Sequence, residues 1–230
     1  MKLDLLYNNK LHKAGLKVAK LLQQNSFQAF WVGGVVRDIL LKYKSDNIDI
    51  ATDALPDEVE KILRKAKIRY GALGKHFGTI MAIVKKVPVE ITTFRTEGRY
   101  SNKRHPDKIV FIKDFLQDAK RRDFTINALY FDPVTKEFFD PTNGIKDLGL
   151  KLIRFIGDPK KKIDEDALRM LRGVRLATQL NFKLEKNTFA AIKTRAKYIQ
   201  GLSINQINKE TEKISDENLL KQTGLMKFIK

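Results

Sequence analysis

Apolar and polar positions along the chain repeat with two periods, one typical of strands and one typical of helices. Residues 29–32 form an apolar run of strand length, and residues 35–43 carry apolar side chains at helical spacing. Gly33 and Gly34 separate these two segments, and residues 47–50 alternate polar with apolar, as a half-buried strand does. The sequence therefore predicts a strand, a glycine turn, a short helix and a second strand, in that order.

The same two periods predict the remaining elements. They predict helices over residues 1–24, 53–66 and 163–180 and from Ser203, a hairpin of strands 79–84 and 87–95, a polar loop over 97–108 and a last strand over 151–155. Gln206 follows Ser203 at the spacing of a capping box. The expected fold class is α+β, with a mixed sheet of about five strands backed by helices.

Composition changes this picture through charge. The 230 residues carry a formal net charge of +18 and a pI near 9.9. Such a surface attracts polyanions, and nucleic acid is the leading candidate. The alternative is a lysine-rich composition that covers every surface with positive charge, and composition alone does not separate the two.

Other classes of function are excluded by what the sequence lacks. It has no cysteine, which excludes disulfides, thiolate nucleophiles and zinc–cysteine sites. No apolar run approaches the length of a membrane span, and the charged N-terminal segment has no apolar signal core. We therefore expect a cytoplasmic protein that does not bind a membrane.

The glycine turn suggests phosphate chemistry. Backbone N–H groups at the start of a helix point outward, and the helix dipole favours an anion there. Gly34 would open this helix, and Arg37, one turn later, can add a bidentate phosphate contact. Positions 47 and 49 share one face of the following strand. Two carboxylates at these positions would hold Mg²⁺ against a triphosphate.

A second candidate site lies in the predicted helix over 163–180. Arg169, Arg172 and Arg175 recur every three residues and would repel one another unless an anion or an acidic partner meets them. Asp166 lies three residues before Arg169, so the two could pair as helical neighbours. Asp166 can accept a hydrogen bond from a base amino group, and Arg169 can donate to base acceptors. An ordinary salt-bridged surface helix is the alternative interpretation.

Several motifs occur in order along the chain, and together they resemble one family. The motifs are GGVVRDILL at 33–41, DIAT at 49–52, VEITTFR at 89–95, RRDFTINAL at 121–129 and E-D-x-x-R at Glu165, Asp166 and Arg169. In this order they resemble the class II tRNA nucleotidyltransferases, or CCA-adding enzymes, and the bacterial poly(A) polymerases. The resemblance covers residues 27 to 225.

The resemblance implies a two-domain arrangement and specific roles. It implies a nucleotidyltransferase head with a mixed sheet over residues 1–157 and an all-helical neck over 158–230, with the family's body and tail domains absent or truncated. The implied roles are metal binding and catalysis for Asn47 and Asp49, a third carboxylate at Glu90, triphosphate binding by Gly34, Arg37 and Arg122, base selection by Asp166 and Arg169, and nucleotide contact by Arg172 and Arg175. Asp123 could hold the fork of Arg122, and the implied metal is Mg²⁺.

Position 47 departs from the family pattern. The family has D-x-D here, and its first Asp falls on Asn47, whereas its second falls on Asp49. An amide oxygen is a neutral and poorer ligand for a hard divalent ion than a carboxylate is. Asp46 should point to the opposite face of the strand and should not replace it. We interpret Asn47 as an engineered inactivation or as the mark of a chain that binds without catalysing.

The function that the resemblance implies is template-independent addition of C, A or both, from CTP and ATP, to the 3′ end of tRNA at its acceptor stem. Three alternatives remain open from the sequence. They are a poly(A) polymerase with the same motifs, a non-catalytic RNA- or nucleotide-binding module, and unspecific binding of RNA by the basic surface.

Overall fold

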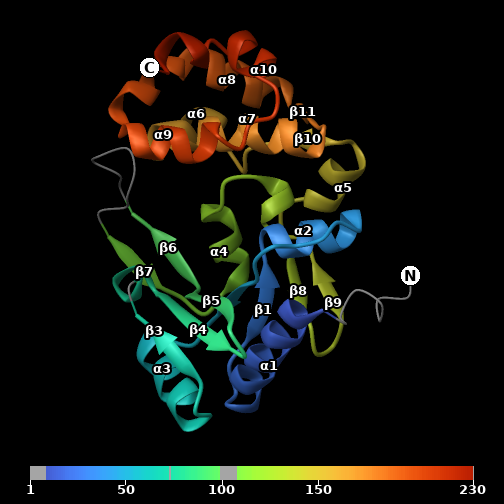
Figure 1. The fold of residues 1–230 in the computed structure, drawn as a ribbon, viewed down its shortest axis with the longest axis vertical. Helices are drawn as coiled ribbons and strands as arrows, with labels where there is room; N and C mark the ends of the chain where they lie inside the picture. Colours follow the sequence, from blue (N-terminus) through green and yellow to red (C-terminus); the bar gives the residue numbers. More distant parts are fainter. Residues whose placement is uncertain (1–8, 73, 99–107, 230) are drawn as a thin grey trace. The chain divides into compact units, whose positions relative to one another are not determined.

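The structure is a computed structural model that describes residues 9–72, 74–98 and 108–229. The chain forms two compact units, each traced in Figure 1. The first unit comprises residues 1–96, 109–121 and 127–142, and the second comprises residues 97–108, 122–126 and 143–230. The start of the expected N-terminal helix and most of the expected polar loop over 97–108 lie outside the described residues.

A seven-stranded mixed sheet is the framework of the first unit, with the order β3-β4-β5-β2-β1-β8-β9. Strands β2 and β5 are parallel, and the other neighbours are antiparallel. The strands are β1 (Ala29–Val32), β2 (Asp49–Thr52), β3 (Arg69–Gly71), β4 (Thr79–Val84), β5 (Val87–Thr93), β8 (Tyr130–Asp132) and β9 (Glu137–Phe139). The expected number of five strands was too low, because strands of three residues are too short to show alternation.

Helices accompany the sheet in the first unit, and a second, smaller strand pair lies beside it. The helices are α1 (Lys10–Gln24), α2 (Gly34–Leu41), α3 (Pro56–Lys65) and α4 (Phe115–Arg121), with a short 3₁₀ turn η2 (Lys75–Phe77). Strand β6 (Arg95–Glu97) pairs with β7 (Ile109–Phe111) in a separate two-stranded sheet. The predicted hairpin is confirmed as β4 and β5, joined by a two-residue turn.

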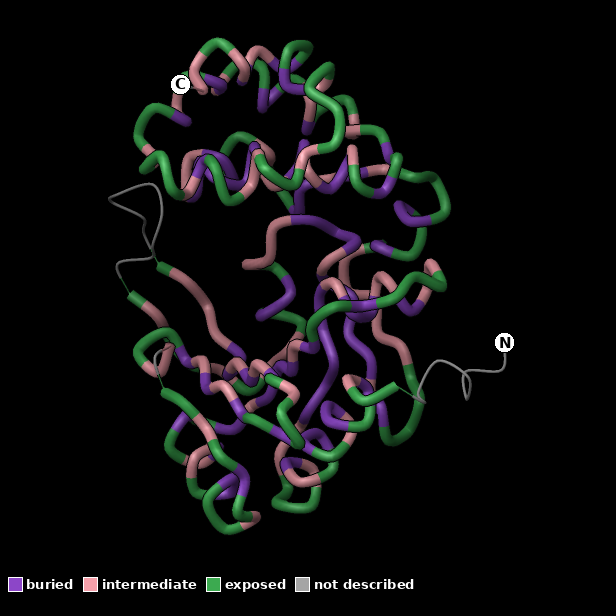
Figure 2. The backbone as a smooth tube through the Cα atoms, in the orientation of Figure 1, coloured by how far each residue is buried: buried purple, intermediate pink, exposed green. Residues whose placement is uncertain are grey.

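The central strands separate two apolar layers. All four residues of β1 are buried, as the purple core strands of Figure 2 illustrate. Trp31 faces α1, which comes close because Gly15 lacks a side chain: a Cβ there would lie 2.0 Å from a side-chain carbon of Ile48. Phe30, on the opposite face, packs against an aromatic cluster that includes Phe115 and Tyr130. Successive side chains along a strand therefore point to opposite faces of the sheet and pack in different apolar layers.

The second unit is mostly helical. Its elements are α5 (Gly144–Gly149), β10 (Leu152–Ile153), α6 (Pro159–Glu165), α7 (Leu168–Leu180), β11 (Lys183–Leu184), α8 (Lys186–Arg195), η4 (Ala196–Gly201), α9 (Ile204–Thr211), α10 (Asn218–Gln222) and η5 (Leu225–Phe228), and the 3₁₀ turn η3 (Thr125–Asn127) begins in this unit. The predicted capping box is present at α9: Ser203 and Gln206 each accept the other's backbone N–H.

Of three predictions for this region, the first is confirmed in part and the other two were wrong. The predicted last strand over 151–155 is short and belongs to a separate parallel pair, β10 with β11, rather than to the main sheet. Because β11 lies at Lys183–Leu184, the segment after residue 157 is not all-helical. The single helix expected over 163–180 is two helices, because residues 166 and 167 break it.

The core of the second unit forms around Phe124. Phe124 and Phe155 are fully or almost fully buried, and their rings stack with centroids 4.7 Å apart. Gly173 of α7 lies directly against this pair, since a Cβ at that position would be 3.1 Å from the Phe124 ring. The expectation that Phe124 is a packing residue is consistent with this burial.

The two compact units and the two predicted domains have different boundaries. The C-terminal unit begins its long segment at residue 143, whereas the predicted head-to-neck boundary follows residue 157, and that boundary stays a prediction. At residue 158, the Asp158 side chain accepts the Lys160 N–H at 2.8 Å and caps α6. Among the described residues, no helix has the length and apolar character that crossing a bilayer requires.

Candidate functional site

The turn between β1 and α2 presents free backbone N–H groups. Gly33 has φ 74° and ψ −136°, a conformation that is open to glycine and strained for other residues. Gly34 is the first residue of α2, and the first hydrogen bond of that helix runs from the Arg37 N–H to the Gly33 carbonyl. The N–H groups before Arg37 have no partner within the helix, so they are available to an anion.

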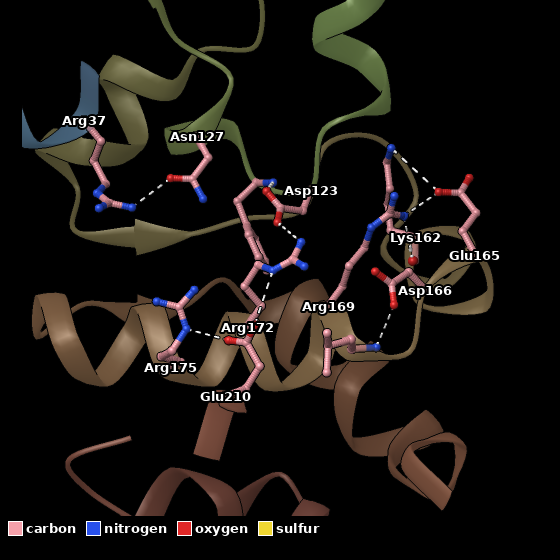
Figure 3. A network of polar contacts seen from close by, with 12 residues as sticks. Arg37, Asp123, Asn127, Lys162, Glu165, Asp166, Arg169, Arg172, Arg175 and Glu210 are labelled. Carbon is pink, nitrogen blue, oxygen red and sulfur yellow. Dashed lines mark hydrogen bonds and ion pairs between the residues drawn. The ribbon is translucent and has the colours of Figure 1, made fainter. Parts of the chain in front are cut away.

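Arg37 is held by two neighbours. Its Nε donates to Asp38 at 2.9 Å. Its Nη1 donates to the side-chain oxygen of Asn127 at 2.9 Å, as Figure 3 shows. Burial raises the pKa of Asp38, and the positive charge of Arg37 opposes that effect. A guanidinium has five N–H donors, so these bonds fix the orientation of Arg37 and leave donors for a phosphate oxygen.

Two carboxylates lie side by side at the start of β2. In the parallel register of β2 and β5, Asp49 is the partner of Glu90. Residues paired in this way point to the same face, with strands about 4.8 Å apart. Both residues are half-buried. Like charges in this position repel each other, and a cation between them would relieve that repulsion.

Asn47 lies just before the strand, and its side chain contacts the carboxylate of Asp49. Strand β2 begins at Asp49, so the prediction that residue 47 belongs to the strand was wrong. The Asn47 side-chain nitrogen nevertheless lies 3.4 Å from each carboxylate oxygen of Asp49. Asn47 is exposed, and it donates its amide N–H groups where a metal ligand would present an oxygen.

The donor set can be tested against a divalent cation. Asp49 and Glu90 supply carboxylate oxygens, the ligands that Mg²⁺ takes, whereas Asn47 would have to turn its amide oxygen toward the site. No cluster of three or more His, Cys, Asp or Glu side chains suited to a metal occurs among the residues that the structure describes. The two carboxylates therefore fit such an ion, and position 47 fits it poorly.

The arginines of α7 have acidic partners within the second unit. Arg172 donates to Asp123 at 2.7 Å, and Arg175 donates to Glu210 of α9 at 2.6 Å (Figure 3). Glu210 also lies 4.0 Å from Arg172. These contacts offset the repulsion that was expected among the arginines of α7. Glu210 is 35 residues away from Arg175, so no local pattern identifies it, although the three-residue spacing of the arginines predicted an anion or an acidic partner.

Asp123 orients the Arg172 guanidinium. Burial acts to raise the pKa of Asp123, but the neighbouring Arg172 charge and its hydrogen bond outweigh burial and hold the pKa below its usual range. The same pair raises the pKa of Arg172 despite its burial. The second oxygen of Asp123 accepts the backbone N–H of Phe124 at 2.8 Å. Arg122, which directly precedes Asp123, is half-buried in the same unit.

Arg169 is fixed by α6. It forms an ion pair with Glu165, and it donates to the backbone carbonyl of Lys162 at 2.9 Å. Lys162 is itself buried, and burial, together with the nearby charge of Arg169, lowers the pKa of Lys162 to about 8 against the pull of Glu165. Lys162 was not among the predicted site residues, because in the sequence it is one of a run of three lysines.

Asp166 lies between α6 and α7 rather than within one helix. Its backbone is extended, with φ −142° and ψ 103°, and its side chain accepts the Leu168 N–H at 3.0 Å. The prediction that Asp166 and Arg169 are neighbours on one helix was therefore wrong. Both residues are almost fully buried, with exposed fractions of 5%. Asp166 is the C-cap of α6, and its side chain accepts the N–H of Leu168, the first residue of α7, whose N-cap position is Ala167.

Comparison with known proteins places the chain in a family. A profile of the poly A polymerase head domain matches residues 29–154, which is more than half of the chain. The chain belongs to this family. The matched residues include the glycine turn, the carboxylate pair and the motif at residues 121–129.

The individual relatives share one description. The chain is 39% identical to the CCA-adding enzyme of Enterococcus faecalis over all of this chain and 54% of that relative, and 40% identical to the CCA-adding enzyme of Ligilactobacillus salivarius over 94% of this chain and 52% of that one. The chain thus spans about half the length of the curated relatives it matches.

Solved structures agree with this placement. The crystal structure of the Bacillus stearothermophilus CCA-adding enzyme in complex with CTP matches 94% of this chain and 53% of its own, with a TM-score of 0.85 and 33% identity. A tRNA nucleotidyltransferase complexed with a primer tRNA and an incoming ATP analog matches 92% of this chain and 62% of its own, with a TM-score of 0.75 and 25% identity. The predicted family and the mixed-sheet α+β fold are confirmed.

Proposed function

We propose that this chain carries the nucleotide-handling part of a tRNA nucleotidyltransferase that adds C and A from CTP and ATP to the 3′ end of tRNA. The observation that carries the proposal is the pairing of Asp49 with Glu90 beside a glycine turn, in a chain whose relatives are CCA-adding enzymes. tRNA maturation would place this activity in the cytoplasm.

In the proposed reaction, the 3′-hydroxyl oxygen of the tRNA attacks the α-phosphorus of the nucleotide. The bond to the pyrophosphate leaving group breaks, and the hydroxyl proton goes to a base, for which Glu90 is the candidate. Arg37, Arg122 and the N–H groups at Gly34 would bind the triphosphate and spread its charge. A bound Mg²⁺, held by Asp49 and Glu90, would supply Lewis acidity and lower the pKa of the 3′-hydroxyl.

Base selection is proposed for the second unit. The carboxylate of Asp166 would accept from a base amino group, and Arg169 would donate to base acceptors, so that protein groups replace a template. Both are fixed by the surrounding structure: Asp166 by the Leu168 N–H, and Arg169 by Glu165. Arg172 and Arg175, oriented by Asp123 and Glu210, would make further nucleotide contacts.

In this proposal the chain is a weak catalyst because position 47 is Asn rather than Asp. Asp at this position would add a third carboxylate, whereas Asn47 presents N–H groups to Asp49. The test is extension of a tRNA transcript that lacks its CCA end, with CTP and ATP supplied separately and together. We expect Asn47→Asp to add up to three nucleotides and the unsubstituted chain to be nearly silent.

Two other functions are separated by the same assay. A poly(A) polymerase, which the family description favours, would add a long A tail instead of three nucleotides or fewer. A non-catalytic binding module, which Asn47 favours, would extend no RNA even after Asn47→Asp, and Mg²⁺ would not improve its nucleotide affinity.

A further inference from the structure

A cavity in the first unit is surrounded by lysines. It has a volume of about 430 Å³ and lies between α1 and the β4–β5 hairpin, with Ala14, Val84 and Val87 among its apolar lining. Its four remaining lining residues are all positively charged: Lys10, Lys13, Lys17 and Lys85. The first three follow one face of α1 at helical spacing.

The charge of this cavity is not neutralised within the described part of the chain. None of its four lysines forms an ion pair there, whereas Lys75 of the same unit lies 2.6 Å from Asp57 and 3.0 Å from Glu60. Like charges at helical spacing destabilise a helix. An external anion would therefore bind at a place where the positive charges lack internal partners.

The hairpin turn provides a second, independent observation. Val84 pairs with Val87, so Lys85 and Lys86 are the two residues of the turn, and both adopt the left-handed region, with φ 49° and 69°. Asn and Gly are the residues preferred in such a turn. The turn thus carries two lysines at positions where their backbone conformation is unfavourable, which is consistent with a use for their charge.

The cavity is separate from the carboxylate pair. Gly15 places α1 against Ile48, whose side chain lies in the α1 layer. Asp49, the next residue, points to the other face of the sheet, as does its partner Glu90. The lysines therefore lie on the face of the sheet opposite the carboxylates, and an anion that they bound would be distinct from a nucleotide held at the carboxylates.

The length of the lysine row indicates an extended polyanion. Lys10 to Lys17 spans about 10 Å along the helix, at 1.5 Å per residue. In double-stranded DNA, successive phosphates of one strand are about 3.4 Å apart along the axis, and on that scale the lysine row spans about three phosphate-to-phosphate steps. We propose that Lys10, Lys13, Lys17 and Lys85 form a docking surface for the phosphate backbone of an RNA duplex. The choice of RNA rests on the proposed function.

The first test measures affinity for a tRNA transcript as a function of salt. The triple variant Lys10→Gln, Lys13→Gln, Lys17→Gln should bind at least about tenfold more weakly at 0.1 M salt, and the slope of log K against log salt should fall by two to three. The matched control is Lys61→Gln, Lys65→Gln, Lys67→Gln, which removes three exposed lysines of α3 and its end in the same unit. We expect this control to change the slope by less than one.

The second test excludes misfolding as the cause of any loss. Lys85→Asn with Lys86→Gly installs the preferred turn, so it should raise the stability of the hairpin while it weakens RNA binding. Weaker binding by a more stable protein cannot result from unfolding. Unchanged RNA affinity in both the triple and the turn variant, with RNA bound by the unsubstituted chain, overturns the docking surface and leaves the proposed function intact.

Other ligands give different results. If the triple variant loses affinity for ATP or inorganic pyrophosphate but keeps its affinity for RNA, the surface binds a small anion and the proposal is wrong. If the triple and the control variants lose RNA affinity equally, the lysines act only through net charge, which also overturns it. If the unsubstituted chain does not bind RNA and the Asn47→Asp variant does not extend it, both the docking surface and the proposed function are wrong.

Discussion

Asp49 of β2 and Glu90 of β5 are register partners in the only parallel pairing that the described main sheet contains. Their side chains share one face, and Gly33 lies close by, since a Cβ at Gly33 would be 3.7 Å from an Asp49 carboxylate oxygen. The parallel pairing brings together two residues that are 41 positions apart in the sequence. A local sequence pattern contains no information on this proximity.

The role of Glu90 can be measured in the Asn47→Asp background. Glu90→Gln should lower the rate of nucleotide addition by about 10²–10⁴-fold, because it removes a carboxylate that acts on the reacting hydroxyl or its metal. The matched control is Glu137→Gln on β9, an exposed glutamate of the same sheet, which should leave the rate unchanged. Single-turnover extension of tRNA gives the rate, and a rate equal to the control would contradict the role of Glu90.

The Asp123–Arg172 pair should stabilise the second unit. Arg172→Ala leaves a half-buried carboxylate without its main partner and should lower the free energy of unfolding by about 1–3 kcal/mol at pH 7. A double-mutant cycle with Asp123→Ala isolates the pair, because removing both partners should cost less than the sum of the single changes.

This pair also predicts a pH dependence. The folded-state pKa of Asp123 is below its usual value of 3.8, so its stabilisation is present above pH 3.8 and is lost as the pH falls through the lowered value. The stability difference between the unsubstituted chain and Asp123→Asn should therefore shrink in acid. Urea unfolding at pH 7 and pH 3 measures it, and a constant difference would argue against the ion pair.

Lys162 should destabilise the fold at neutral pH. Its pKa is about 8 when folded and near 10.5 when unfolded, so the unfolded chain binds the proton more tightly. The free energy of unfolding should rise between pH 8 and pH 10.5, by up to about 3 kcal/mol from this group. Lys162→Met should remove that rise and increase stability at pH 7.

The control for Lys162 is its exposed neighbour. Lys161→Met removes the same charge one residue earlier and should leave the rise with pH in place. Urea unfolding at pH 7, 9 and 10.5 compares the three proteins. If Lys162→Met and Lys161→Met follow the same curve, the burial of Lys162 does not control its pKa.

The two glycines of the β1–α2 turn should respond differently to the same substitution. Gly33→Ala places a side chain on a backbone with positive φ and should cost about 1–3 kcal/mol of stability. Gly34→Ala adds a methyl group in ordinary contact with Arg37 and should be nearly neutral. Thermal unfolding and ATP affinity test this contrast, and equal effects would mean that the turn conformation is not required.

The strongly periodic parts of the fold could be predicted from the sequence. The strand at 29–32, the hairpin at 79–93 and the cap at Ser203 depend on local alternation and on capping spacing. The break at Asp166 could not be predicted in this way. Apolar residues keep their helical spacing across it, and only the bond from Leu168 to Asp166 shows that a second helix starts there.

The partners of the arginines lie beyond any local rule. Arg175 meets Glu210 from another helix, and Arg172 meets Asp123, which is 49 residues earlier. The repulsion among the arginines of α7 predicted an anion or an acidic partner, but it did not indicate which of the two or which residues. Sequence patterns thus identified the charged groups of the candidate site, and tertiary contacts determined how each one is oriented.

The motif at residues 122–126 belongs to the second unit, although the chain on both sides of it belongs to the first. Asp123 and Phe124 are held there by Arg172, Phe155 and the space left by Gly173. The backbone passes between the units five times, so no single peptide bond separates them. Neither unit is therefore a continuous segment of the chain, so neither could be excised or exchanged as a single piece.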